Sequence, residues 1–497
     1  MRLHARVAVA AACLGSASAL AGPNLGAEDP AWLALRDQIA LGRIADPLGG
    51  VTWLGEERAA ALLAGVSESG AAAAAVPAGL WARPVHRLAL RAAAADEHDR
   101  PYSLPAHPRD LAGVFALSCE HQEGRPCGDG AGLALELDSA AGYGDWLTAA
   151  TRVRARVGSG DFGQALDLDR AYLKFEVGPL AVQLGRDALA LGPGVRSATM
   201  VSDHAVPQDG VRLQLHPVAL PFAPWLRVSL FYFLDRLRAP QTFSGTLLDC
   251  MRMQVDLADR LQLGGSRLLQ LGGDGAPGFG GLWGFVGEHF GRSTNASPEG
   301  AENNRLSLDA SLRLPELRGA RLYYEIAFED TRNPLSNSIL YDADHLLGLE
   351  VRAVDLGPLR RLFVEALKTS WFSQEHGLFR TGMTNGGRTL GTPYGPDVDS
   401  LWLRADLAFG GALVSPWTEW LRCFSDRYDV TDAAGVFLVA RGVTEHRQRL
   451  GVDLTAKLAP GWTLSGGLFG ERVGNADLIA GATRLNAGMR ASLAWEP

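Results

Sequence analysis

The sequence predicts an all-β protein: a large transmembrane antiparallel β-barrel of about 18 strands, with a small helical segment on the periplasmic side. Apolar and polar residues alternate over about four hundred residues after residue 86 without a linker, a longer run than β-sandwiches have. One side of this alternation is apolar and the other carries charges of both signs, as in a lipid-facing wall around a polar lumen. Tight connections alternate with long ones, as periplasmic turns alternate with external loops.

The first 21 residues are predicted to be a secretory signal peptide. Arg2 and Arg6 precede an apolar run, and Ala19 with Ala21 forms an A-x-A cleavage site. Cys13 lies inside the run and lacks the leucine three positions earlier that a lipoprotein signal has, so it is interpreted as a small apolar residue. No later stretch has the roughly 18 apolar residues of a spanning helix. We therefore expect a barrel in the outer membrane of a Gram-negative cell.

Residues 22–85 are predicted to form an N-terminal helical segment and a connector. Within 29–66, apolar residues such as Trp32 and Leu35 recur at helical spacing. Asp29 can cap the first helix, with a proline at the next position. A barrel of about 18 strands has a wide lumen that needs an obstruction. We therefore expect these helices to cover its periplasmic mouth.

Residues 86–497 are assigned to the barrel. RLSLDASLRL, at 305–314, places leucines and an alanine on one face and charged residues and serines on the other, and RLGVDLTAKL, at 449–458, repeats this pattern. In LDLDRAYLKFEVG the apolar positions switch from even to odd numbers, which predicts a bulge or turn around Asp169 and Arg170. At about 22 residues per strand and connection, 16 to 20 strands fit, and 18 is the central even number.

Two segments resemble sequences of the Wzi-like capsule-assembly outer-membrane proteins. LGRDALALGPGVRSATMVSDHAVP, at 184–207, has G-R-[DE], then L-G-P-G, then a serine and a polar pair before alanine and proline. MTNGGRTLGTPYGPDVDS, at 383–400, resembles the family's G-R-x-x-G…G-x-D segment. LRDQIALGRIADPLGGVTWL, at 35–54, resembles the paired helices ahead of the family's barrel. The resemblance extends over nearly the whole mature chain.

The resemblance implies a non-enzymatic role: binding or organising surface polysaccharide of the capsular type, partly in a lectin-like manner. It makes the following residues candidates for ligand binding: Arg186, Asp187, Asp203, His204, Arg388, Asp397 and Asp399. It assigns a structural motif to Gly185, Gly192, Pro193, Gly194, Gly391 and Gly395. Arginine can pair in a two-pronged manner with the carboxylate of an acidic sugar.

A structural interpretation of the same residues remains open. Gly192 to Gly194 can merely shape a turn, and Arg186 can form a salt bridge with Asp187 inside the barrel. The chain also departs from the family, which often has aromatic residues where this chain has leucines and Met383. The family has two asparagines at 203–204, where this chain has an aspartate and a histidine. These departures remove surfaces for sugar stacking and change the expected ligand specificity.

Two further features have alternative explanations. Cys119 and Cys127 are close enough in sequence to form a disulfide in an oxidising compartment, although four independent thiols are the alternative. Arg152, Arg154 and Arg156 share one strand face. They could guide an anionic polymer, but the preferred interpretation is that they balance carboxylates in the lumen.

Several function classes are unsupported by the sequence. The formal charge is −8, from 47 basic and 55 acidic residues, so nothing suggests a nucleic-acid partner. Two Asp-x-Asp pairs, at 167–169 and 397–399, lack the other ligands of a calcium loop, so we expect no metal and no cofactor. No serine lies in a nucleophile elbow. We expect a monomer with surface polysaccharide and outer-membrane lipid as partners; a diffusion channel for sugars or anions is the alternative, and a lipid hydrolase a distant third.

Overall fold

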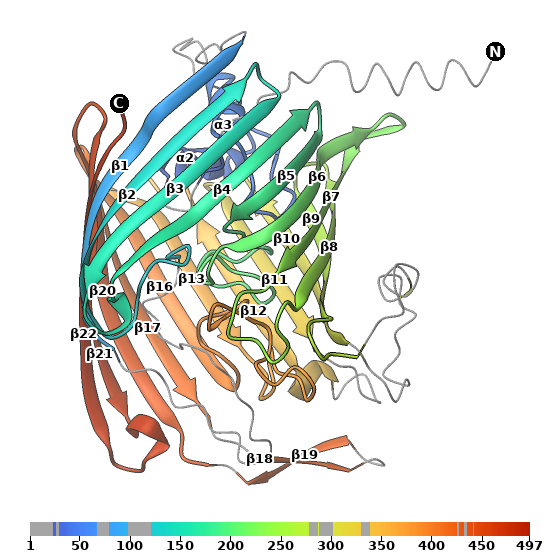
Figure 1. The fold of residues 1–497 in the computed structure, drawn as a ribbon, viewed down its shortest axis with the longest axis vertical. Coiled ribbons are helices and arrows are strands. Elements are labelled where there is room, and N and C mark those ends of the chain that lie inside the picture. Colours follow the sequence, from blue (N-terminus) through green and yellow to red (C-terminus); the bar gives the residue numbers. More distant parts are fainter. Residues whose placement is uncertain are drawn as a thin grey trace.

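The structure is a computed structural model, which describes residues 23–25, 29–66, 79–97, 121–277, 287, 302–329, 338–424, 427–431, 435–440 and 442–497. Two α-helices, α2 (Pro30–Ala40) and α3 (Glu56–Ala64), precede the strands in this part of the chain. Eighteen strands form one antiparallel sheet, which the pairing of β1 with β22 closes into a barrel (Figure 1). The predicted fold class is therefore confirmed.

The barrel strands are β1 (Leu80–Asp96), β2 (Gly130–Tyr143), β3 (Leu147–Gly158), β4 (Ala165–Val177), β5 (Leu180–Asp187), β6 (Gln208–Leu220), β7 (Ala223–Arg236), β8 (Leu247–Leu257), β9 (Leu261–Leu271), β10 (Glu302–Leu314), β11 (Ala320–Phe328), β12 (Ala343–Val351), β13 (Leu359–Lys368), β16 (Val398–Phe409), β17 (Ala412–Cys423), β20 (Glu445–Ala459), β21 (Trp462–Gly474) and β22 (Thr483–Trp495). Two hairpins lie in the connections, β14 (Thr384–Asn385) with β15 (Arg388–Thr389) and β18 (Arg427–Thr431) with β19 (Gly435–Ala440). Short helical turns are η2 (Gly160–Phe162), η3 (Ser338–Asp342) and η4 (Ala476–Leu478). The barrel begins at Leu80, before the predicted boundary at residue 86.

The strand faces follow the alternation of the sequence. In β10, Arg305 and Ser307 are 1% and 0% exposed, whereas Leu306 and Leu308 are 41% and 52% exposed. The apolar side chains therefore form the outer, lipid-facing wall, and the polar ones face the lumen. Exposed aromatic residues near the short turns form the belt expected at a membrane interface: Tyr143, Trp146, Phe222, Trp225, Phe409 and Trp462.

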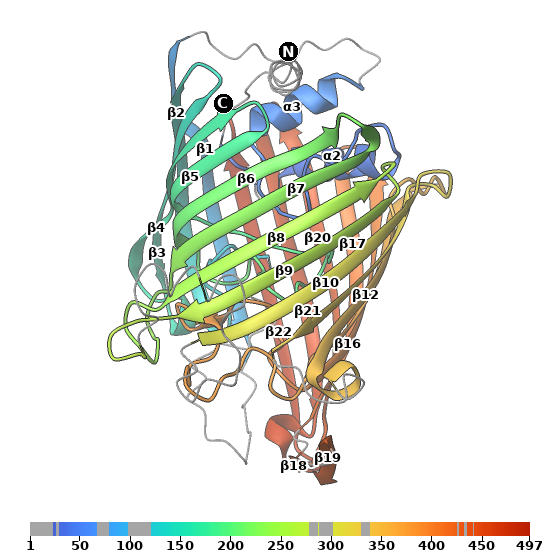
Figure 2. The same ribbon diagram turned by 90° about the vertical axis from the view of Figure 1, so that its right-hand side faces the viewer.

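The connections define the two ends of the barrel. At one end, strands are joined by short turns such as 178–179 and 221–222, and the other end has long connections such as 188–207 and 369–397. The helices and the C-terminus lie at the short-turn end (Figure 1), and the strands are strongly tilted (Figure 2). Short turns face the periplasm in this class of barrel. None of the described helices is long and apolar enough to cross a membrane.

The predicted bulge in β4 is confirmed. The register between β3 and β4 shifts where Arg152 pairs with Arg170 and Val153 pairs with Leu168, which leaves Asp169 without a partner in the ladder. One extra residue moves the following side chains to the other face. This shift keeps apolar residues outside on both sides of Asp169.

Candidate functional site

The N-terminal helical segment is held in the lumen at the short-turn end. Its apolar residues pack mainly on one another, and its polar groups contact the barrel wall. Asp37 of α2 accepts hydrogen bonds from Arg361 at 2.5 Å and Arg352 at 3.2 Å. The Trp53 indole N–H donates to Gln183 at 2.8 Å. The segment is therefore a compact unit attached to the wall by polar contacts and by the packing of Trp53 on Phe231, with ring centroids 5.7 Å apart.

The connection from β5 to β6, residues 188–207, folds into the lumen. Glu365 of β13 accepts hydrogen bonds from the backbone N–H groups of Val195, Arg196 and Ser197, at 2.8, 3.2 and 2.7 Å. The same carboxylate accepts a hydrogen bond from the Tyr323 hydroxyl at 2.7 Å. One buried carboxylate thus fixes the loop that contains the first family-like segment.

The connection from β13 to β16, residues 369–397, also folds inward and meets the first loop. The Ser202 N–H donates to the Leu390 carbonyl at 2.7 Å. Apolar residues of both loops share one buried cluster, including Met200, Val201 and Met383. The structure therefore brings the two family-like segments together inside the barrel.

The motif glycines have structural reasons. Gly192 has φ +109°, a conformation that favours glycine. A Cβ at Gly194 would lie 1.8 Å from the carbonyl oxygen of Ser197, so a larger residue would have to open the turn. Pro193 lies between them and lines the cavity described below. Close backbone or side-chain approach likewise leaves no room for a Cβ at Gly185 or Gly391, and Gly395 has φ +72°.

Arg186 and Asp187 lie on opposite faces of β5. Arg186 has the same orientation as the exposed Leu184 and pairs with Asp209 on the outer wall at 2.5 and 2.7 Å. Asp187 faces the lumen and accepts a hydrogen bond from Arg170 at 2.8 Å. The prediction of a salt bridge between Arg186 and Asp187 is therefore wrong, because the side chains of neighbouring strand residues point to opposite faces.

Arg388 joins the two inward loops to a third segment. Its guanidinium donates to the carbonyl oxygens of His204 at 3.0 Å and Arg125 at 2.8 Å, and no described carboxylate forms an ion pair with it. Burial, and secondarily the charge of Arg154, lowers the pKa of Arg388 to about 10. The contacts are those of a residue that connects loops, and glycan contact by Arg388 stays a prediction.

Asp203 and His204 have different environments. Asp203 lines the cavity, with a carboxylate oxygen 3.0 Å from Nδ1 of His121. His204 is fully buried, with Nδ1 2.5 Å from the Ser202 hydroxyl and Nε2 3.1 Å from the Thr389 hydroxyl. Burial, and then the nearby Arg388, lowers the pKa of His204 to about 3. This imidazole is therefore neutral and belongs to the loop packing.

We expect the inward loops to lose stability on acidification because of His204. Its folded-state pKa lies below the ordinary value of about 6.5, so its contribution is complete above pH 6.5 and declines as the pH falls toward 3. Between pH 7 and pH 5 the expected loss is about 2 kcal/mol. Thermal unfolding of the detergent-folded protein at both pH values measures it. In His204→Asn the loss should be smaller, and an equal loss in both proteins would contradict the assignment.

The other predicted residues are two aspartates, Asp397 and Asp399, and two cysteines. Asp397 is buried in the inward loop with φ +60°, and Asp399 lies on the outer face of β16, 2.7 Å from Arg422. Cys127 is disulfide-bonded and Cys250 is a buried free thiol. Cys119 lies outside the described residues, so its pairing with Cys127 stays a prediction.

The basic strip on β3 is paired with carboxylates, as the preferred interpretation had it. Its three arginines face the lumen, and each lies beside an aspartate of a neighbouring strand. Two of these aspartates are the Asp-x-Asp pair of β4. The N···O distances are 2.6 Å for Arg152 and Asp138, 2.8 Å for Arg154 and Asp169, and 2.8 Å for Arg156 and Asp167.

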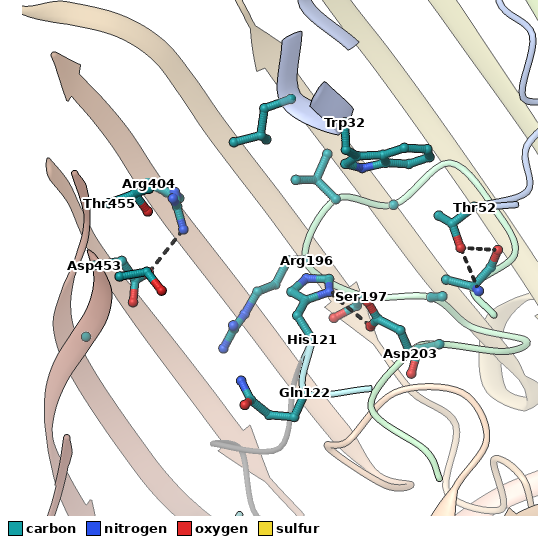
Figure 3. Close-up of a pocket in the computed structure, with 18 of the residues that line it drawn as sticks. Trp32, Thr52, His121, Gln122, Arg196, Ser197, Asp203, Arg404, Asp453 and Thr455 are labelled. Carbon is teal, nitrogen blue, oxygen red and sulfur yellow. Dashed lines mark hydrogen bonds and ion pairs between the residues drawn. The ribbon is translucent and has the colours of Figure 1, made fainter. Parts of the chain in front are cut away.

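A cavity of about 450 Å³ remains between the helical segment, the inward loops and the wall of the barrel. Figure 3 shows Trp32 on one side, Arg404 and Asp453 on the strand wall, and Arg196 reaching from the first loop toward that wall. The described lining includes thirteen arginines but only seven carboxylates. Of the predicted site residues, Gly192, Pro193, Gly194, Asp203 and Cys127 line it. The cavity is the candidate functional site.

Ion pairs link five of the cavity arginines, together with Arg361, into a continuous network from α2 to β22. Six arginines share four carboxylates, so the network retains a positive charge. Its members are Arg36, Arg321, Arg352, Arg361, Arg404 and Arg490, with Asp37, Glu350, Asp406 and Asp453.

The sequence interpretation missed the cavity wall. It selected residues in the family-like loops, whereas the wall also includes side chains of β16, β17, β20, β21 and β22. The signal was present in the alternation, because the missed residues occupy lumen-facing positions of their strands. The missed residues are Trp402, Arg404, Trp417, Arg449, Phe469 and Arg490.

Comparisons with known proteins agree with the resemblance. A structure of Wzi from Escherichia coli, described as an outer-membrane protein involved in group 1 capsule assembly and a carbohydrate-binding β-barrel, is 15% identical, covers 96% of this chain and 100% of its own, and has a TM-score of 0.66. OccD3 of Pseudomonas aeruginosa is 12% identical, with 86% and 93% coverage and a TM-score of 0.47. A BenF-like porin from Pseudomonas fluorescens is 11% identical, with 84% and 98% coverage and a TM-score of 0.45.

The comparison with curated proteins finds no match. A family model, described as capsule assembly protein Wzi, matches residues 114–487, which include both inward loops and most of the barrel. The architecture is that of a large outer-membrane barrel. The chain therefore belongs to the Wzi capsule-assembly family.

Proposed function

We propose that this protein is a non-catalytic outer-membrane barrel that binds a surface polysaccharide and takes part in retaining or organising it at the cell surface. The observation that carries the proposal is the cavity, whose lining combines guanidinium groups with the tryptophans Trp32, Trp402 and Trp417. Sugars offer hydroxyl groups for hydrogen bonds and apolar ring faces for aromatic contact. Family membership agrees with this function, because the Escherichia coli Wzi is described as carbohydrate-binding.

A diffusion channel is less well supported. The helical segment lies at the short-turn mouth, and the inward loops pack on each other through buried apolar residues. Residues fixed in this way occupy much of the cross-section that a channel would need to keep open. The solved porins that resemble the chain have the lower TM-scores.

Deleting the gene in the bacterium that encodes the protein should move surface polysaccharide from the cell fraction into the medium. Purified, detergent-folded protein should also bind the polysaccharide extracted from those cells, and heat-unfolded protein serves as the control. Both readouts follow from retention by direct binding. Normal retention in the deletion strain, together with no binding by the folded protein, would refute the proposal.

A further inference from the structure

The wall of β16, β17, β20, β21 and β22 presents three neighbouring rows of lumen-facing residues. The strand registers align Trp402, Glu419, Arg449, Glu471 and Asn486 in the first row, on the side of the long connections. They align Arg404, Trp417, Gly451, Phe469 and Gly488 in the next row, named here the aromatic row. They align Ser415, Asp453, Gly467 and Arg490 in the third row, on the short-turn side of the aromatic row.

Glycines let the two rings of the aromatic row lie against the wall. A Cβ at Gly451 would be 2.3 Å from the Trp417 ring, and a Cβ at Gly488 would be 2.2 Å from the Phe469 ring. Each ring therefore leans over the backbone of the next strand instead of projecting across the lumen. Both rings remain only partly buried and line the cavity. The result is an apolar platform on this part of the lumen wall.

On the long-connection side of the platform, the charge of the arginine is compensated by carboxylates within the wall. Arg449 is 2% exposed and lies within 3.6 Å of Glu97, Glu419 and Glu471. Its guanidinium is 5.6 Å from the Trp417 ring centroid and 4.9 Å from that of Phe469. This arginine lies against both rings and is almost fully buried, so it is a positioning residue.

Beside the platform and on its short-turn side, the charges of two arginines are only partly compensated. Arg404 and Arg490 each lie 3.1 Å from Asp453, which they share. Arg404 also lies 2.8 Å from Asp406, which it shares with Arg361. The side chains of Arg404 and Arg490 are 26% and 44% exposed although both face the lumen, so the exposed parts border the cavity. Gly467 makes room here, since a Cβ would lie 2.4 Å from a carboxylate oxygen of Asp453.

We propose that this wall binds an acidic sugar, with the pyranose ring on Trp417 and Phe469 and its carboxylate at the exposed sides of Arg404 and Arg490 that Asp453 does not occupy. Guanidinium groups recognise carboxylates by charge-assisted hydrogen bonds. Thr455 and Ser465, aligned in the next row, supply hydroxyl groups at the cavity surface. A cavity of about 450 Å³ accepts a few sugar units, so the site takes a chain end or a short oligosaccharide. This inference rests on the proposed function and adds its ligand class and place.

The test compares two tetrasaccharides that differ only in charge. Calorimetric titration of the full-length, detergent-folded protein uses a hyaluronan tetrasaccharide, which contains glucuronate, and the same tetrasaccharide with its carboxyl groups reduced to alcohols. The carboxylate form should bind at least about tenfold more tightly, and Arg404→Gln and Arg490→Gln should each weaken it about tenfold. The matched control is Arg422→Gln, on the outer face of β17, which should bind as the wild type does.

Heat-modifiable gel migration checks that each variant is folded. If Arg404→Gln does not fold, Arg490→Gln decides, because its side chain is the more exposed of the two. Equal affinity for the two tetrasaccharides, absent binding of both, or unchanged affinity in folded Arg490→Gln would overturn the inference. Binding of the extracted polysaccharide, measured on the same samples, separates the two failures. If the wild type binds the polymer, the proposed function stays intact. If it does not, and the deletion strain retains its polysaccharide normally, both are refuted.

Discussion

Deleting residues 29–66 should raise the conductance of the purified protein in planar bilayers severalfold without unfolding the barrel. The segment fills the short-turn mouth, where Asp37 pairs with Arg352 and Arg361. Most of its apolar residues pack on one another, and only Val51 and Trp53 join the apolar cluster of the barrel and the inward loops, so its removal exposes a limited apolar surface. An 18-stranded barrel without such an obstruction leaves an aqueous passage.

The matched control for the deletion is Arg43→Ala. Arg43 lies in the same segment but makes an exposed hydrogen bond to Gln38, away from the wall. The conductance of the Arg43→Ala protein should equal that of the wild type. Unchanged conductance in the folded deletion protein would show that the inward loops alone close the lumen, and would contradict the obstruction by the helices.

Replacing Glu365 by alanine should strongly destabilise the first inward loop. The change removes the acceptor for three backbone N–H groups of the first inward loop and for the Tyr323 hydroxyl. Each buried donor left without a partner costs about 1–3 kcal/mol, so a loss of several kcal/mol is expected. The loop should also become accessible to trypsin at Arg196.

Thermal unfolding and limited proteolysis of the detergent-folded variant measure these two effects. Glu316→Ala is the control, because Glu316 is exposed at a short turn and pairs there with the exposed Arg260. Its unfolding midpoint and cleavage pattern should match the wild type. A Glu365→Ala protein that melts normally and resists trypsin would show that the apolar packing between the loops is sufficient to hold them.

The strand faces could be predicted because they depend on neighbouring residues alone. The period of two placed Leu306 and Leu308 outside and Arg305 inside, and a single change of parity placed the bulge at Asp169. The number of strands followed from the length and from the even strand number of such barrels. The same rule would also have placed Arg186 on the outer wall, had the alternation around it been followed.

The candidate site could be predicted only in part. The family-like segments around Gly192 and Met383 were found from their motifs, and the structure packs them together across nearly two hundred residues of chain. Their polar residues, however, mostly hold the loops: His204 is neutral and buried, and Arg388 donates to backbone carbonyls. A motif identifies such residues but does not separate those that fasten a loop from those that face a ligand.

The sequence by itself determined the barrel, the helical segment before it, the family resemblance and the face on which most strand residues lie. These properties follow from local periodicity, turn spacing and motif order, which need no knowledge of distant contacts. Only the tertiary structure decided which charges pair, as Arg186 with Asp209, and which arginines border the cavity, as Arg404 and Arg490. These pairings depend on the closure of the sheet, because the stagger of the strands determines which carboxylate lies beside each arginine. The sequence alone does not distinguish among these carboxylates.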